Sequence, residues 1–269
     1  MPQPSSPLYG ARQVTATNGL PPALKDVGID QRLNQPLPLD LSFRDETGQT
    51  VQLNQYFGKR PVILSMVYYN CPMLCTQVLN GMVSSLRVIS FNPGEQYEII
   101  SVSFDPRETP ALAATKKTNY VNSLPAAKRA GAISGWHFLT GDETNIRRLT
   151  EAVGFRYHWD EATKQFAHAS GIMVLTPEGK VAQYYYGIEY APKDLRLGLV
   201  EASANKIGTP VDQLLLFCYH YDPATGKYRV VMNVMRVAGG ITIIGIVLLL
   251  FALHRRAAAQ LRLRPGSAV

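Results

Sequence analysis

The stretch VILSMVYYNCPMLC, residues 62–75, decides the fold of this 269-residue chain. Its first half, Val62–Tyr68, is a short apolar run rich in β-branched and aromatic residues, which predicts a buried strand. After it, apolar residues recur at every fourth position and predict a helix that continues to about Ile89. Those apolar residues are Leu74, Val78, Met82 and Leu86. The cysteines Cys71 and Cys75 therefore lie where a buried strand passes into a helix.

Strand and helix signals alternate on both sides of this stretch. One hairpin is predicted before it, with strands at Leu41–Arg44 and Val51–Leu53, and another after it around Pro177–Gly179. The other predicted elements are strands at 97–104, 138–140, 171–176 and 181–186, and helices at 109–123, 142–153 and 192–204. This alternation predicts an α/β fold in which helices flank a mixed sheet.

Composition divides the chain into five parts. They are a proline-rich extended arm at 1–36, the compact domain at 37–205, a connector with one predicted strand at 206–236, an apolar helix at 237–254, and a basic tail at 255–269. The apolar content of 46% and the charged content of 17% exclude a wholly disordered chain. The net charge of +7 comes largely from the arginines of the tail. The sequence has no Lys/Arg-rich face interleaved with aromatic residues, so it gives no indication of a nucleic-acid partner.

The run Val237–Leu253 contains no charged residue, and Arg236 and His254 border it. Such a run predicts a single C-terminal transmembrane helix, with a buried core helix as the alternative. The tail arginines slightly favour a cytoplasmic C-terminus, which would put the main domain on the periplasmic side of a bacterial-type inner membrane. The start of the sequence, MPQPSSPLYG, shows no export signal, so a removed signal, a truncated start and the inverted topology all stay open.

The cysteine pair is the strongest chemical signal. Only three cysteines occur, and Cys71 and Cys75 are separated by one helical turn, which puts both sulfurs on one helix face. The unpaired N–H groups and the dipole at a helix N-terminus favour thiolate, so a lowered thiol pKa is expected. Such a pair can close a disulfide or hold a soft ion such as Cu(I), and an added imidazole makes Cu(II) or Zn(II) accessible. Inert core cysteines are the plain alternative.

The third cysteine belongs to a separate feature. Cys218 and His220 are spaced to share one face of the strand predicted in the connector. An accessory metal site, a resolving thiol and a contact with a membrane partner are the functional alternatives. An aromatic-rich strand that packs on the domain or on lipid headgroups is the favoured interpretation.

Four motifs in the same order resemble the Sco/SenC family. They are Val67–Cys75, Ser101–Thr109, Trp136–Gly141 and Phe166–Gly179. The resemblance implies a thioredoxin-like fold and a role in delivering copper to the binuclear centre of cytochrome c oxidase. It also implies that Cys71, Cys75 and His168 are the metal ligands. The ion would be Cu(I), with Cu(II) open, and the partner would be the copper-bearing oxidase subunit or another cysteine-containing copper acceptor.

The sequence departs from that family at two positions. Met73 and Ala167 stand where many relatives carry an acid, the latter directly before the histidine, where a carboxylate would orient the imidazole. We therefore keep a second hypothesis, in which Cys71 and Cys75 act on partner cysteines as a thiol–disulfide oxidoreductase without obligatory metal. A structural disulfide is the third. No motif of a classical enzyme competes with the thiol pair.

Overall fold

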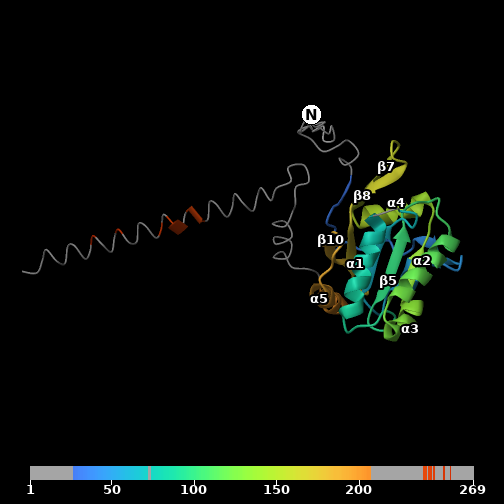
Figure 1. Cartoon of the computed structure of the whole chain (residues 1–269), viewed down its shortest axis with the longest axis horizontal. Helices are drawn as coiled ribbons and strands as arrows, with labels where there is room; N and C mark the ends of the chain where they lie inside the picture. Colours follow the sequence, from blue (N-terminus) through green and yellow to red (C-terminus); the bar gives the residue numbers. More distant parts are fainter. Residues whose placement is uncertain are drawn as a thin grey trace, which may run out of the picture. The chain divides into compact units, whose positions relative to one another are not determined.

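The computed structural model describes residues 27–71 and 74–206, together with a few scattered residues between 239 and 255. Residues 27–206 fall within one compact unit, Leu20–Thr209. A five-stranded sheet lies at the centre of that unit (Figure 1). Its strand order is β10-β9-β4-β5-β6, with bounds Val181–Tyr186, Gly171–Leu175, Val62–Val67, Glu98–Ser103 and Trp136–Leu139.

The position of β4 at the centre of the sheet explains why five of its six residues are apolar, with Ser65 as the exception. It pairs in parallel with β5 and antiparallel with β9, and β5 pairs in parallel with β6. Helices cover both faces of such a sheet, so all six residues of β4 are buried. The parallel strands β4, β5 and β6 also share one carboxyl end, and the loops that follow β4 and β5 meet there.

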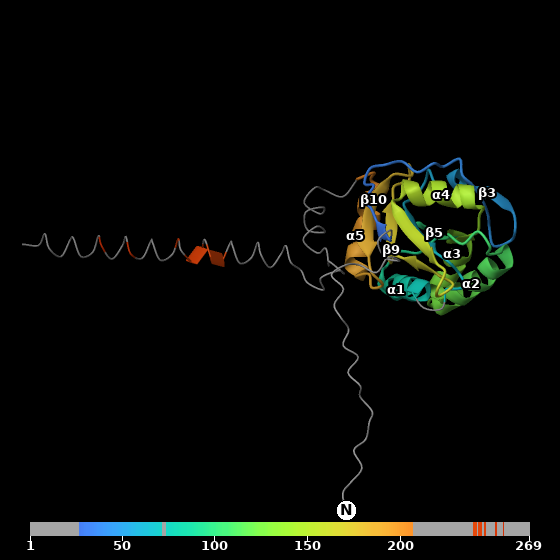
Figure 2. The same ribbon diagram turned by 90° about the horizontal axis from the view of Figure 1, so that it is seen from above.

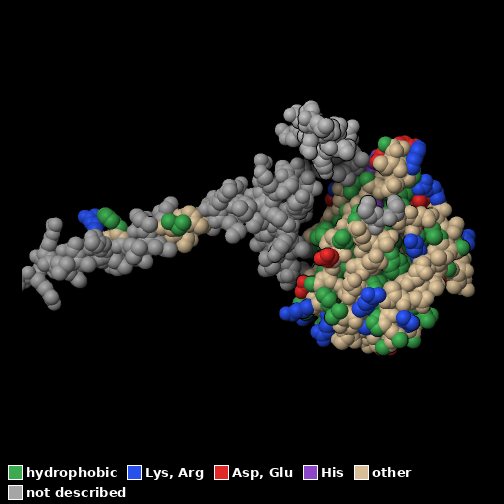
Figure 3. All heavy atoms as spheres, in the orientation of Figure 1, with side chains coloured by type: hydrophobic (Ala, Val, Ile, Leu, Met, Phe, Trp, Pro, Cys, Tyr) green, Lys and Arg blue, Asp and Glu red, His purple; other side chains and the backbone are tan. Residues whose placement is uncertain are grey.

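Five helices flank the sheet. They are α1 (Leu74–Val88), α2 (Pro110–Ser123), α3 (Ala126–Gly135), α4 (Glu143–Ala152) and α5 (Pro192–Ser203). Figure 2 shows α1 and α2 on one side of the sheet and α4 on the other, while α5 packs on β9, β10 and α1. On the face shown in Figure 3, the described Lys and Arg side chains are scattered rather than gathered.

Smaller elements complete the unit. A hairpin of β2 (Ser42–Arg44) and β3 (Thr50–Gln52) leads into a 3-10 helix, η2 (Leu53–Tyr56). A separate three-stranded sheet has the order β1-β7-β8, with bounds Gly28–Ile29, Phe155–Asp160 and Gln165–His168. Figure 1 shows the β7–β8 hairpin projecting at the end of the molecule toward which β5 runs. This hairpin brings the end of β8 toward the carboxyl ends of the parallel strands.

Most predicted elements of the compact domain are confirmed, with bounds that shift by a few residues. The mixed α/β architecture fits the thioredoxin-like fold expected from the resemblance. The sequence analysis did not predict four elements: helix α3, the β7–β8 hairpin, strand β1 and the 3-10 helix η2. Helix α3 has a weak apolar pattern and contains Gly131 and Gly135, where a Cβ would come within 2.3 Å and 2.1 Å of backbone atoms of the loop before β5.

Several sequence predictions fall outside the described residues. The strand predicted at 214–221, with Cys218 and His220, lies wholly outside them, and the apolar helix predicted at 237–254 lies largely outside them. Within the part of the chain that the structure describes, no helix has the length and apolar character needed to cross a membrane.

Candidate metal centre

Cys71, Cys75 and His168 meet at the carboxyl end of the central sheet. Cys71 lies in the turn after β4, Cys75 is in the first turn of α1, and His168 is the last residue of β8. Their ligand atoms, two Sγ and one imidazole nitrogen, all lie within 4.8 Å of one another, and all three residues are buried. The fold thus brings together the three side chains that the sequence analysis singled out.

The imidazole is oriented by the backbone. Nε2 of His168 lies 3.2 Å from Sγ of Cys75, and Nδ1 lies 2.8 Å from the carbonyl oxygen of Ala169. A carbonyl can only accept a hydrogen bond, so the neutral ring carries its proton on Nδ1. The Nε2 lone pair then faces the sulfurs, which is the arrangement that a metal-ligating histidine needs.

The two sulfurs accept hydrogen bonds from nearby backbone amides. The N–H of Cys75 donates to Sγ of Cys71, and the N–H of Tyr68 donates to Sγ of Cys75, both at 3.3 Å. No disulfide joins Cys71 and Cys75 in this structure. Both N–H groups belong to the segment that leads from β4 into α1, so this segment itself supplies hydrogen-bond donors to the two sulfurs.

The expectation of a lowered thiol pKa is wrong for Cys75. Burial is the largest effect and raises the pKa of the Cys75 thiol, and the adjacent Cys71 raises it further. The hydrogen bond from Tyr68 lowers the pKa but does not offset the burial. Only 2% of Cys75 is exposed, and at that depth the loss of water outweighs the dipole of the helix. A bound cation would reverse this balance, because a coordinated thiol is deprotonated.

Aromatic rings surround the imidazole of His168. The ring centroids of Phe104, Tyr68 and Phe155 lie 5.2, 5.8 and 6.2 Å from the imidazole centroid. These rings come from three different segments, and they line the site with apolar surface. Such a wall limits the access of water and lowers the local dielectric constant, which strengthens electrostatic interactions within the site. Sequence analysis did not single out any of the three.

Glu108 is a second contributor that sequence analysis missed. Its carboxylate is buried among the backbone of the Tyr69–Asn70 turn and the hydroxyl of Ser103. Burial raises the pKa of Glu108, although the three hydrogen bonds act in the opposite direction. The only sequence signal was its place in the Ser101–Thr109 motif.

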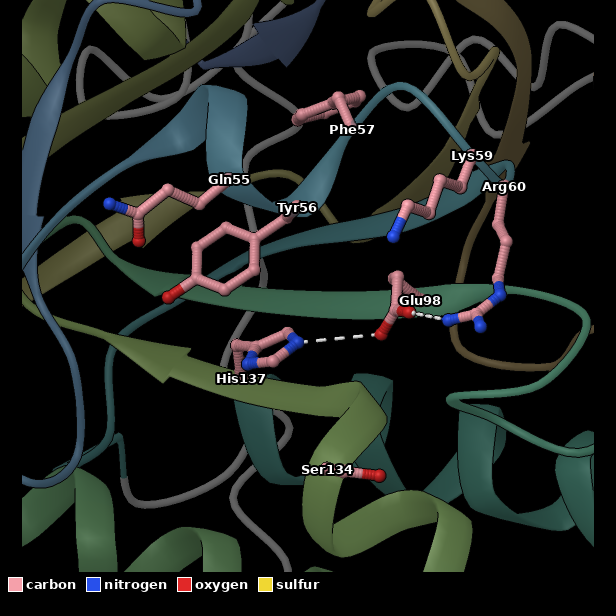
Figure 4. A pocket seen from close by; sticks show the side chains of 8 residues that line it. All are labelled: Gln55, Tyr56, Phe57, Lys59, Arg60, Glu98, Ser134 and His137. Carbon is pink, nitrogen blue, oxygen red and sulfur yellow. Dashed lines mark hydrogen bonds and ion pairs between the residues drawn. The ribbon is translucent and has the colours of Figure 1, made fainter.

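A different polar cluster lies at the opposite end of the parallel strands. Figure 4 shows Glu98, at the start of β5, between Arg60 and His137, both of which bind its carboxylate. The Tyr56 ring lies over the imidazole of His137, with centroids 4.1 Å apart. The Glu98 carboxylate therefore gives His137 a hydrogen-bonding partner far from the thiols, and the cluster is distinct from the candidate metal centre.

Known proteins resemble this chain over most of the residues that the compact domain contains. The profile of the SCO1/SenC family matches residues 30–197. The SCO1 protein homolog of Bacillus subtilis (strain 168) is 24% identical over 170 residues, a match that covers 61% of this chain and 82% of that protein.

Solved structures support the fold. A protein from Aquifex aeolicus VF5 is 24% identical with a TM-score of 0.56, and the match covers 64% of this chain and 95% of that one. A SCO1/SenC family lipoprotein from Bacillus anthracis str. Ames is 18% identical with a TM-score of 0.51, over 65% of this chain and 99% of that one. Since the family profile spans more than half of the sequence, including all three candidate ligands, this chain belongs to the SCO1/SenC family.

Proposed function

We propose that this protein is a membrane-tethered copper chaperone for the assembly of the copper centre of a respiratory cytochrome c oxidase. The observation that carries the proposal is the buried cluster of Cys71, Cys75 and His168, whose ligand atoms lie within 4.8 Å of one another. Membership of the SCO1/SenC family supports it. Copper is the cargo in this proposal, and the acceptor is the copper-bearing oxidase subunit or another cysteine-containing protein.

The donor set suits copper. Two thiolates select Cu(I), and the imidazole is a good ligand for either oxidation state, so the same three residues could also hold Cu(II). The histidine gives the sharper argument. Neither thiol exchange nor a structural disulfide requires an imidazole, yet His168 presents Nε2 at 3.2 Å from Sγ of Cys75 across 93 residues of sequence. A metal gains a third ligand from that placement.

Membrane attachment is the part of the proposal that rests on sequence. The uncharged run Val237–Leu253, bordered by Arg236 and His254, supports a C-terminal anchor. The arginines of the tail support a periplasmic position for the domain that carries the thiols. On this proposal the anchor keeps the copper site close to an acceptor that is itself in the membrane.

One alternative function has an observation in its favour. No disulfide joins Cys71 and Cys75, and their sulfurs lie within 4.8 Å of each other, which is close enough for a modest movement to join them. As an oxidoreductase, the pair would form a disulfide while a partner disulfide takes up the two electrons and two protons. This activity uses the same sulfurs and does not need His168.

A Cu(I) titration of the full chain in detergent against a competing chelator tests the proposal. Wild type should bind one copper per chain, and Cys71→Ser, Cys75→Ser and His168→Ala should each weaken binding. His158→Ala is the matched control, because His158 is an exposed histidine on β7 of the same hairpin. If wild type binds no tighter than the double-cysteine variant, the chaperone function is rejected. If His168→Ala binds like wild type while disulfide exchange persists, the oxidoreductase function replaces it.

A further inference from the structure

One loop contacts both halves of the candidate metal centre. The segment between β5 and α2, residues 104–109, places two consecutive side chains in opposite directions. Glu108 reaches the turn that carries Cys71, and Arg107 reaches the β7–β8 hairpin that carries His168. The two halves belong to different sheets, and this loop is one element that contacts both.

Glu108 holds the thiol side of the site. Its carboxylate accepts hydrogen bonds from the backbone N–H of Tyr69 at 2.7 Å and of Asn70 at 2.6 Å, and from the hydroxyl of Ser103 at 2.6 Å. Tyr69 and Asn70 are the two residues directly before Cys71. Hydrogen bonds to a carboxylate are roughly twice as strong as neutral ones, and a buried amide without an acceptor is costly. Glu108 therefore fixes the path of the backbone into the first cysteine.

Arg107 holds the histidine side. Its guanidinium donates two hydrogen bonds of 2.7 Å to the carboxylate of Asp105, which fixes the plane of the group. In that orientation the guanidinium carbon lies 4.4 Å from the ring centroid of Trp159 and 5.5 Å from that of Phe166. These rings stand on β7 and β8, and Phe166 is two residues before His168. The cation over the two rings holds the hairpin against the loop.

We propose that Arg107 and Glu108 are positioning residues of the metal centre. They hold the turn that carries Cys71 and the β7–β8 hairpin that carries His168 at fixed positions relative to each other before the metal binds. The proposal rests on the proposed function, because it explains how the three ligands of the copper ion are held close to one another. Its physical content is preorganisation. A site whose ligands are already held loses less conformational freedom on binding and therefore binds more tightly.

The Glu108 arm compares Glu108→Gln with Glu98→Gln. Glu98 is the matched control because it is a half-buried carboxylate at the start of β5, the strand that precedes the loop, and it pairs with Arg60 and His137 away from the thiols (Figure 4). Glutamine keeps the shape of glutamate, but its amide cannot accept from both backbone N–H groups with equal strength. We expect faster hydrogen exchange at the Tyr69 and Asn70 amides of the copper-free protein, and Cu(I) affinity lower by roughly 10-fold. Glu98→Gln should change neither.

The Arg107 arm compares Arg107→Met with Arg147→Met. Arg147 is a matched exposed arginine, ion-paired to Glu143 within α4. Loss of the cation over Trp159 should lower Cu(I) affinity by roughly 2- to 5-fold. It should also weaken the nitrogen coupling of the imidazole in the electron paramagnetic resonance spectrum of the Cu(II) form, a change that general destabilisation would not produce. Arg107→Lys keeps the charge and should recover part of the effect.

The outcomes separate this proposal from the proposed function. If wild type binds no copper, the proposed function fails, and the amide exchange of the copper-free protein still decides whether Glu108 holds the turn. If Glu108→Gln keeps the wild-type exchange and affinity, or if Glu98→Gln is equally impaired, the positioning role is overturned. If Glu108→Gln does not fold, the Arg107 arm decides, and an unchanged imidazole coupling in Arg107→Met overturns the proposal.

Discussion

Nδ1 of His168 lies 2.8 Å from the carbonyl oxygen of Ala169, and this contact determines which imidazole nitrogen faces the thiols. The sequence lacks an acid at Ala167, directly before the histidine, where many relatives carry one. The backbone carbonyl supplies the acceptor instead. An orienting partner for the ring is therefore present although the side chain expected to provide it is missing.

This contact predicts the tautomer of His168. The neutral imidazole should carry its proton on Nδ1, because the carbonyl of Ala169 cannot donate. Long-range proton–nitrogen correlation spectra of the copper-free protein should therefore show a protonated Nδ1 and an unprotonated Nε2. The exposed His158 is the internal comparison and should show exchange between tautomers. A proton on Nε2 of His168 would contradict the assigned ligand atom.

Tyr69→Phe should destabilise the protein. The Tyr69 hydroxyl is completely buried and lies 2.8 Å from the carbonyl oxygens of Ser101 on β5 and Leu139 on β6. Removing the hydroxyl takes the donor from both carbonyls and should lower the free energy of unfolding by about 1–3 kcal/mol. Urea denaturation measures the change. Tyr185→Phe, whose hydroxyl bonds a carbonyl at an exposed position, should cost less than about 0.5 kcal/mol.

Gly81→Ala should also be destabilising, although alanine favours a helix more than glycine does. Gly81 lies within α1, and a Cβ there would come within 1.8 Å of the carbonyl oxygen of Ile188. Relief requires a backbone shift, which typically costs about 1–3 kcal/mol and outweighs the gain of about 1 kcal/mol in helix propensity. Thermal and urea unfolding should both show the loss. Ser84→Ala, at an exposed position of the same helix, should leave stability unchanged within about 0.5 kcal/mol.

Asp142→Ala should lower stability more at neutral pH than at low pH. The Asp142 side chain caps α4 by accepting from the N–H of Asn145 at 2.9 Å, and this contact lowers the pKa of Asp142. A carboxyl whose pKa is lower in the folded state stabilises above its unfolded pKa, and the contribution disappears as pH falls through the folded pKa. Loss of the cap should cost about 1 kcal/mol at pH 7.

Measuring the free energy of unfolding at pH 7 and near pH 2 tests the direction of this pH dependence. The difference in the free energy of unfolding between wild type and Asp142→Ala should be smaller at the lower pH. Asp142→Asn is the control, since asparagine caps a helix about as well as aspartate and does not titrate. A difference that is the same at both pH values would show that the cap does not depend on the charge.

The central elements could be predicted because their patterns are strong. Strand β4 is apolar at every position except Ser65, and α1 carries apolar residues at every fourth position. Aromatic and polar residues alternate in FRYHWD at Phe155–Asp160, which is a strand pattern. The β7–β8 hairpin was missed nevertheless, because no glycine or proline marks its turn.

The site was predictable only in part. The spacing of Cys71 and Cys75 indicated their chemistry, and His168 was identified through the family resemblance. The thiol pKa of Cys75 was predicted in the wrong direction, because a sequence does not reveal how deeply the start of a helix is buried. Glu108 was missed for a similar reason. Its partners are backbone amides nearly forty positions earlier, and contacts of that kind leave no residue pattern.

The ligands of the candidate metal centre are contributed by two separate sheets. Cys75 and His168 are 93 positions apart, and they meet only after β4, β5 and β6 have paired and the β7–β8 hairpin has closed over them. Contacts between such distant parts of a chain form late in folding, because the entropy of closing the loop has to be overcome first. A chain that stops short of the native state would offer two thiols without the imidazole. The three-ligand site is therefore complete only in the folded chain, and an incompletely folded chain would hold Cu(I) less tightly through its two thiols alone.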